Sequence, residues 1–155
     1  MAVKARPLGR IDGHSNWAQR DFVVTSGVTI TAGDFVYFDG SGRITNASIA
    51  TQQLLGMATQ TATGTAGSVK CSVIIDPFML YLLDNDNDTT TFAVTHVGTK
   101  FDLTGATGAQ LVDTNTTSTT GSLTCIEFNP QIDPVKDDTS VGVFMINEHA
   151  LFKSQ

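Results

Sequence analysis

The sequence predicts an all-β protein, either a β-sandwich or a β-barrel of about nine or ten short strands. The 155-residue chain contains 23 threonines and 14 glycines but only 15% charged residues. Threonine favours the pleated, half-buried surface of a sheet, and glycine supplies the positive φ that tight turns need. Short runs of alternating apolar and polar residues recur along the chain, and no segment has the spacing of an amphipathic helix.

The first half of the body consists of short β-rich runs separated by glycine turns. The run 34–39 (DFVYFD) is followed by the turn GSGR and by residues 43–45, a pattern typical of a β-hairpin. In residues 68–75 (SVKCSVII), Cys71 and Val73 fall on one face of an alternating strand. Further strands are expected at 21–25, 27–31, 54–60 and 78–83.

The second half of the body also consists of short β-rich runs separated by turn-forming segments. Residues 46–53 are polar and indicate a helical turn or a loop, and residues 106–121 are rich in turn formers. Cys71 and Cys125 both lie in alternating runs, so we expect two reduced thiols in the core. Strands are expected at 91–98, 100–105, 122–130 and 141–147.

Residues 1–24 are expected to form an extended N-terminal arm, with residues 25–155 as the β-rich body. The arm shows neither helical nor strand periodicity, and it holds the only tryptophan. Residues 1–20 carry a net charge of +3, whereas the rest of the chain carries −9. This balance argues against nucleic-acid binding and favours an acidic partner surface, including a second copy of the chain. Arginine and tryptophan are frequent interface anchors, so we expect Arg6, Arg10, Trp17 and Arg20 to form an interface.

No catalytic or metal motif is present in the sequence, so we expect neither enzymatic activity nor a cofactor. There is no nucleophile elbow, phosphate loop or paired-cysteine motif, and His14, His96 and His149 lack metal-ligand spacing. No apolar run approaches the ~18 residues of a membrane helix. The first twenty residues lack the apolar stretch of a secretory signal, so we expect synthesis in a cytoplasm.

The acidic run DNDND places Asp84, Asp86 and Asp88 at alternate positions, like the start of a calcium-binding loop. An EF-hand frame would need glycine at the sixth position and glutamate at the twelfth, where this chain has Thr89 and Thr95. We therefore expect a solvated acidic turn, with a calcium site or a subunit contact as the alternative.

Several turn and strand motifs resemble those of the small capsid-decoration (cement) proteins of tailed bacteriophages. The matching residues are Gly33-Asp34, Leu55-Gly56-Met57-Ala58, Gly67-Ser68-Val69 and the segment 98–104 (GTKFDLT). The resemblance implies a homotrimer that binds the major capsid protein on the outer surface of the virion and clamps the shell. It implies no catalytic residue, no direct nucleic-acid contact and no membrane.

Two other functions fit the same residues. One is a different phage structural component, such as a tail-tube, head-tail joining or fibre-tip protein. The other is a carbohydrate-binding β-sandwich module, which would use exposed aromatic rings as sugar platforms and would predict glycan-dependent quenching of Trp17 fluorescence.

Overall fold

The structure is a computed structural model that describes residues 5–47, 53–86, 91–114, 121–128, 140–147 and 149–151. These residues form thirteen strands and one short 3-10 helix, η1 (Val94–His96). The strands are β1 (Arg6–Arg10), β2 (Gln19–Val23), β3 (Thr29–Ile30), β4 (Phe35–Phe38), β5 (Ile44–Asn46), β6 (Gly56–Ala58), β7 (Ala62–Thr63), β8 (Lys70–Ile74), β9 (Met79–Asp84), β10 (Lys100–Thr104), β11 (Leu111–Asp113), β12 (Leu123–Phe128) and β13 (Val141–Ile146).

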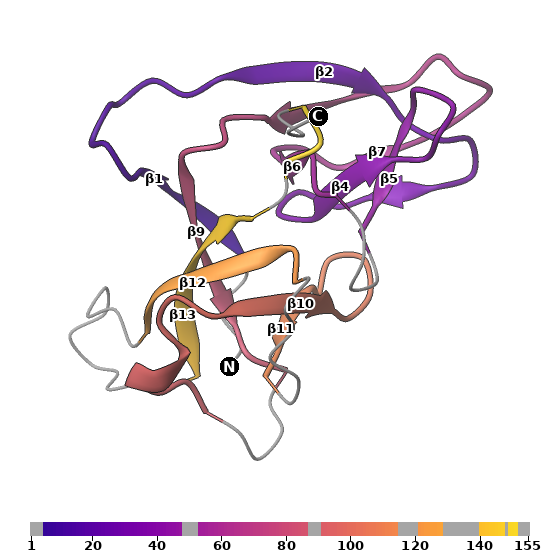
Figure 1. Cartoon of the computed structure of the whole chain (residues 1–155). Helices are drawn as coiled ribbons and strands as arrows, with labels where there is room; N and C mark the ends of the chain where they lie inside the picture. Colours follow the sequence, from indigo (N-terminus) through magenta and orange to yellow (C-terminus); the bar gives the residue numbers. More distant parts are fainter. Residues whose placement is uncertain are drawn as a thin grey trace.

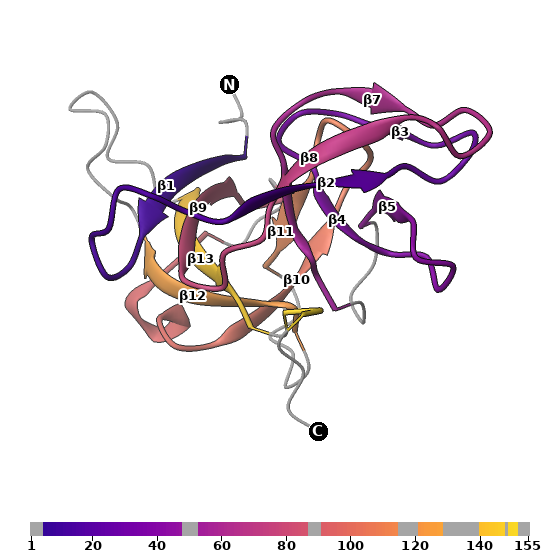
Figure 2. The same cartoon turned by 90° about the horizontal axis from the view of Figure 1, so that it is seen from above.

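The strands form three sheets in a sandwich-like arrangement, not a closed barrel (Figures 1 and 2). The six-stranded sheet has the order β1-β9-β13-β12-β10-β11, the five-stranded sheet has the order β2-β8-β6-β4-β5, and β3 pairs with β7. The predicted all-β class is confirmed. The described strands outnumber the nine or ten expected, because short strands such as β7 and β11 lie in segments that the sequence presents as turns.

The hairpin and the alternating strand that the sequence predicts are both present. Strands β4 and β5 pair antiparallel, with Tyr37 opposite Thr45. Strand β8 buries Cys71 and Val73 on one face, as the alternation predicts. Cys71 and Cys125 are both buried and free, so the prediction of two core thiols is confirmed.

The prediction of a strand over residues 91–98 is wrong, because this segment turns through η1 instead. The Nδ1 of His96 accepts a hydrogen bond from the backbone N–H of Ala93 (3.1 Å), and the His96 N–H donates to the Ala93 carbonyl (2.9 Å). These local bonds replace a sheet ladder. Phe92 is buried and packs against Phe101, which anchors the turn to the core.

Some predictions fall outside the described residues. The choice between a helical turn and a loop at 46–53 concerns mostly residues 48–52, and the end of the strand expected at 122–130 concerns residues 129 and 130. Most of the turn-rich stretch beyond Thr114 is also outside the described part of the chain.

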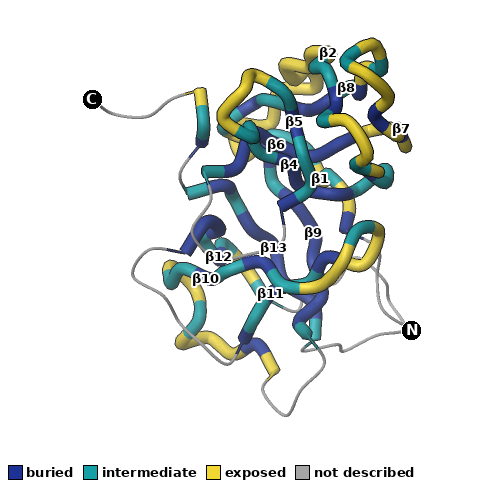
Figure 3. The backbone as a smooth tube through the Cα atoms, turned by 90° about the vertical axis from the view of Figure 1, so that its right-hand side faces the viewer, coloured by how far each residue is buried: buried dark blue, intermediate teal, exposed yellow. Residues whose placement is uncertain are grey.

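The main core lies between the six-stranded and five-stranded sheets, where Phe35 of β4 meets Tyr81 of β9 edge-on with ring centroids 4.9 Å apart. Such edge-to-face pairs add about 0.5–1.5 kcal/mol beyond the area they bury. The five-stranded sheet is also buried on its other face, where Val36 and Val73 pack towards Ile30 of the two-stranded sheet. Figure 3 shows the resulting run of buried segments through both halves of the molecule.

A buried glutamine joins the two large sheets. The Oε1 of Gln110, just before β11, accepts a hydrogen bond from the N–H of Phe35 (2.5 Å), and its Nε2 donates to the carbonyls of Phe35 and Ala47. Beside it, the buried carboxylate of Asp34 accepts a bond from the N–H of Gly108 (2.6 Å). The segment between β10 and β11 is therefore bonded to β4 and its flanking residues, and the Gln110 bonds are buried.

We expect Gln110→Ala to lower the free energy of unfolding by about 2–4 kcal/mol, because it leaves buried backbone groups of Phe35 and Ala47 without partners. Urea unfolding followed by circular dichroism measures this loss. Gln60→Ala is the matched control, since within the described residues the exposed Gln60 amide donates one hydrogen bond, to the Lys70 carbonyl (3.3 Å). Its effect should stay within about 0.5 kcal/mol. Equal losses in the two variants would contradict the role given to Gln110.

Candidate interaction site

Residues 6–23, called the strap from here on, form one edge of both large sheets. Its first strand, β1, pairs with β9, and its second strand, β2, pairs with β8. Arg10 lies opposite Met79 and Gln19 lies opposite Ile74, so the strap runs antiparallel to residues 70–82 across both sheets. Figure 2 shows β1 and β2 following each other along one side of the molecule.

The sequence indicated an arm without regular structure here and did not predict strand β1, whereas the strand expected at 21–25 overlaps the second half of β2. Both strands are held by backbone ladders and lie at sheet edges, where side chains are only partly covered. The burial required for an apolar alternation is therefore missing, although the backbone is extended and paired. The division of the chain into residues 1–24 and 25–155 stays a prediction.

The bend of the strap is organised by Asp76, whose side chain is only 3% exposed. Its Oδ2 accepts hydrogen bonds from the Nη1 of Arg10 (2.7 Å) and the N–H of Ala18 (3.4 Å), and its Oδ1 accepts one from the N–H of Phe78 (2.9 Å). The Ile75 N–H also donates to the Ala18 carbonyl (2.9 Å). The sequence did not indicate these contacts, because Arg10 and Ala18 are 66 and 58 residues away from Asp76 along the chain.

Arg10 makes a second ion pair at this bend. Its Nε and Nη2 donate to the two carboxylate oxygens of Asp12, at 2.9 and 2.6 Å. These hydrogen bonds lower the pKa of Asp12 to about 2, and the same contact raises the pKa of Arg10. The guanidinium also lies 5.4 Å from the ring centroid of Phe78. Arg10, predicted as an interface anchor, is thus occupied by two carboxylates of its own chain.

Exposed apolar side chains gather on the strap and at its bend. Among the described residues, four of the seven exposed large apolar side chains are Leu8, Ile11 and Trp17 of the strap and Phe78 beside it. Ile11 and Phe78 are directly linked, since the Ile11 N–H donates to the Phe78 carbonyl (2.9 Å). Trp17 is 40% exposed and precedes Ala18, which is bonded to Asp76. The N–H of Ala18, one residue after Trp17, and the Nη1 of Arg10 bond to the same oxygen of Asp76.

Arg6 and Arg20, the other two predicted anchors, lie apart on the two strands of the strap. Both are exposed. Arg20 donates to the Gln19 carbonyl (3.1 Å), and both ion pairs found in the described part of the chain belong to Arg10. Their guanidinium groups therefore remain available to a partner, unlike that of Arg10.

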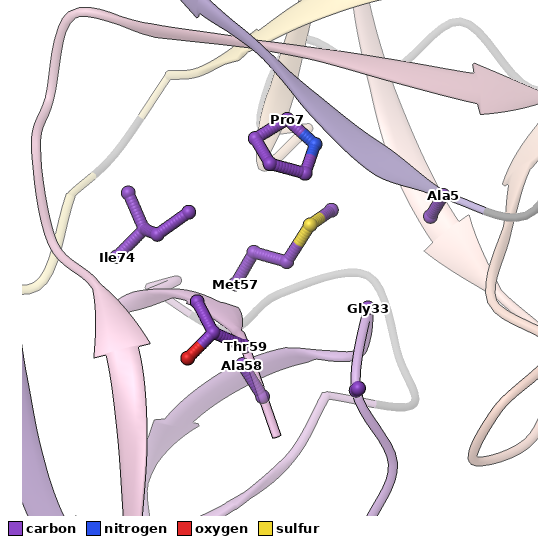
Figure 4. A pocket seen from close by; sticks show the side chains of 8 residues that line it. Ala5, Pro7, Gly33, Met57, Ala58, Thr59 and Ile74 are labelled. Atoms are coloured by element: carbon purple, nitrogen blue, oxygen red, sulfur yellow. The ribbon is translucent and has the colours of Figure 1, made fainter. Parts of the chain in front are cut away.

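Two pockets adjoin the strap. A polar pocket of about 290 Å³ is lined by Arg10, His14, Ser15 and Asn16 at the bend. An apolar pocket of about 280 Å³ lies between β1 and the five-stranded sheet, where Pro7 faces Met57 and Ile74 (Figure 4). The apolar pocket is therefore bounded by Pro7 of the strap on one side and by β6 and β8 on the other.

The acidic run after β9 does not assemble a metal site in the described residues, where no group of three or more potential ligands is placed to hold a metal ion. Asp84 is buried at the end of β9, and the Oδ1 of Asp86 accepts a hydrogen bond from the hydroxyl of Thr114 (2.9 Å). Asp88 lies outside the described residues.

The remaining candidate groups are the two cysteines and the three histidines. Burial raises the pKa of Cys125 to about 11 and also raises that of Cys71, so neither thiol is activated. His14 is on the strap, His96 is in η1 and His149 is buried near β6, with Leu54 as its bridge partner. These three histidines do not form a common cluster.

No protein-family model and no curated protein matches the chain. In the part of the chain that the structure describes, no helix is long and apolar enough to span a membrane.

We expect the Arg10–Asp12 pair to make stability depend on pH in the acid range. Since the pKa of Asp12 falls from its ordinary 3.8 to about 2 in the folded protein, its contribution is present above about pH 4 and is lost as the pH falls towards 2. Urea midpoints measured between about pH 5 and pH 2 should fall more steeply in the unmodified protein than in Asp12→Asn. If the urea midpoints of the two proteins fell equally with pH, the role given to the Arg10–Asp12 pair would be contradicted.

Proposed function

We propose that this chain is a structural virion protein. It binds the outer surface of a bacteriophage capsid and stabilises the shell by non-covalent cross-bridging of capsid subunits. The resemblance of its turn and strand motifs to capsid-decoration proteins supports the proposal, as does an all-β fold with a large exposed edge. Its partners in this function are the major capsid protein and further copies of itself.

The observation that carries the proposal is the composition of the strap. It supplies an edge strand to each large sheet and carries two exposed arginines and three of the exposed large apolar side chains. Edge strands leave one row of backbone groups unpaired, so natural proteins usually cover or protect them. Arg6 and Arg20 supply the charged contacts to the shell, Trp17 adds an aromatic contact, and Arg10 holds the shape of the bend.

Binding to a capsid shell becomes stronger when one oligomer presents several copies of the strap. A contact through one exposed strap is modest, but several straps presented by one oligomer to a regular lattice bind together through a raised effective concentration. We propose a homotrimer as that oligomer.

We expect light scattering after gel filtration to give the mass of a discrete trimer. The resemblance to decoration proteins implies this trimer, and the charges favour association of copies, since residues 1–20 carry a net charge of +3 and the rest of the chain carries −9. The trimer should weaken as ionic strength rises. A hexamer or an open polymer would contradict the trimer and would favour a tail or connector component.

We expect Arg6→Glu and Arg20→Glu each to weaken binding to capsids by at least about tenfold. The measurement is co-sedimentation of the purified protein with expanded, undecorated capsids of the phage that encodes it. Lys100→Glu, which makes the same charge change on β10, is the control. Point variants are preferable to deletion of residues 1–20, because deletion would expose the edges of β8 and β9.

Two results would contradict the proposed function. One is failure of the unmodified protein to sediment with the capsids. The other is equal binding by the strap variants and Lys100→Glu while circular dichroism shows all of them folded.

A further inference from the structure

The turn that contains η1 presents two apolar side chains to solvent. Val94 is 72% exposed, the largest fraction among the large apolar side chains of the described residues, and Val97 is 45% exposed. A single exposed valine needs no explanation, but these two belong to one short turn, residues 93–98, called the valine turn from here on. The valine turn is therefore a small apolar projection on the surface.

The valine turn is held in one shape by hydrogen bonds and by a ring contact. The hydroxyl of Thr99 donates to the His96 carbonyl (2.7 Å), and the N–H of Gly98 donates to the Cys125 carbonyl of β12 (2.8 Å). The His96 ring meets the Phe101 ring edge-on, with centroids 5.5 Å apart. A projection that is fixed beforehand loses little conformational entropy when it binds.

The apolar pocket beside β1 offers a site for such a projection. Met57 and Ile74 form its floor, and each is only 1% exposed. Pro7 and Ala32 at its rim are half-buried and Thr59 is exposed, so the pocket opens to solvent (Figure 4). An apolar cavity of about 150 Å³ holds one benzene molecule. The pocket, of about 280 Å³, therefore has room for the side chains of two valines.

The valine turn and the apolar pocket belong to different sides of the molecule. The helix η1 contacts β12 of the six-stranded sheet, whereas the pocket lies between β1 and the five-stranded sheet. In Figure 2, β1 and the short reddish coil of η1 lie on opposite sides of β13. The valine turn of one chain therefore reaches such a pocket only on another copy of the chain.

The charges of the chain favour this contact between copies. The pocket is bordered by Ala5 and Pro7, which belong to residues 1–20 with a net charge of +3, whereas the valine turn belongs to the remaining residues with −9. Copies that place one of these surfaces against the other attract each other. A contact between two different surfaces repeats from copy to copy, and it closes into a ring when the rotation between copies permits. Three copies joined in this way give the proposed trimer.

We infer that the valine turn of one copy, through Val94 and Val97, inserts into the apolar pocket of the next copy between Pro7 and Met57. The inference rests on the proposed self-association of the chain and names the two surfaces that produce it. The shell contacts assigned to Arg20 and Trp17 use other residues.

Two variants interrupt the contact from its two sides. Val94→Asp places a carboxylate on the valine turn, and Ala32→Asp places one at the rim of the pocket. Each should weaken self-association at least about tenfold, because charged groups are depleted at the apolar centre of an interface. Leu151→Asp is the control, since Leu151 is also an exposed apolar side chain but belongs to neither surface. Masses are measured by light scattering after gel filtration at up to about 0.5 mM protein, and circular dichroism shows whether each variant is folded.

A mixture of the two variants gives the sharper test. Val94→Asp keeps an intact pocket and Ala32→Asp keeps an intact valine turn, so one contact can form between them. The other contact stays broken, because it would bring the two introduced carboxylates together. We expect the equimolar mixture to reach twice the monomer mass and no more. Thr59→Asp, at the exposed part of the rim, replaces Ala32→Asp if the latter does not fold.

Three results would overturn the inference. The unmodified protein stays monomeric over this concentration range, either variant associates as strongly as Leu151→Asp, or the mixture of folded variants keeps the monomer mass. Failure of the proposed shell binding has a different signature. In that case the variants pair in solution, but the unmodified protein does not sediment with capsids.

Discussion

The fold depends on the close approach of two chain crossings between its large sheets. The chain leaves the six-stranded sheet after β1 and returns to it before β9, and these two passages lie side by side at Asp76. A buried carboxylate that accepts several hydrogen bonds is stable only while its partners stay in place. Asp76 therefore fixes the course of both passages at once, and with them the orientation of one sheet relative to the other.

Gln110 makes the second polar connection, away from this bend. It closes the gap between the β10–β11 turn and β4, beside the buried Asp34. A buried polar group that is hydrogen-bonded adds little to the free energy of folding, but one that has lost its partner destabilises the fold strongly. Such groups therefore favour the one arrangement of the sheets in which all of them are hydrogen-bonded. In this chain, apolar packing holds the layers together, and a few buried polar side chains set how the layers meet.

The sequence predicted the parts of this structure that depend on local patterns. The hairpin β4–β5 and the strand β8 follow from glycine turns and alternation, because one face of each strand is buried. Strand β1 escaped prediction and β2 was predicted only from residue 21 onward, since edge strands with exposed side chains need no alternation. Of the four expected interface residues, the sequence could not show that Arg10 is turned towards Asp76, because that partner is 66 residues away.

The same separation has a consequence for synthesis of the protein. The strap leaves the ribosome before its pairing partners β8 and β9, which are among residues 70–84. Until then β1 and β2 have no ladder to join, and contacts between distant segments are slow to form. The nascent chain therefore carries the unpaired, partly apolar strap until residues 70–84 have been made, and chaperones that bind such segments can act during that interval.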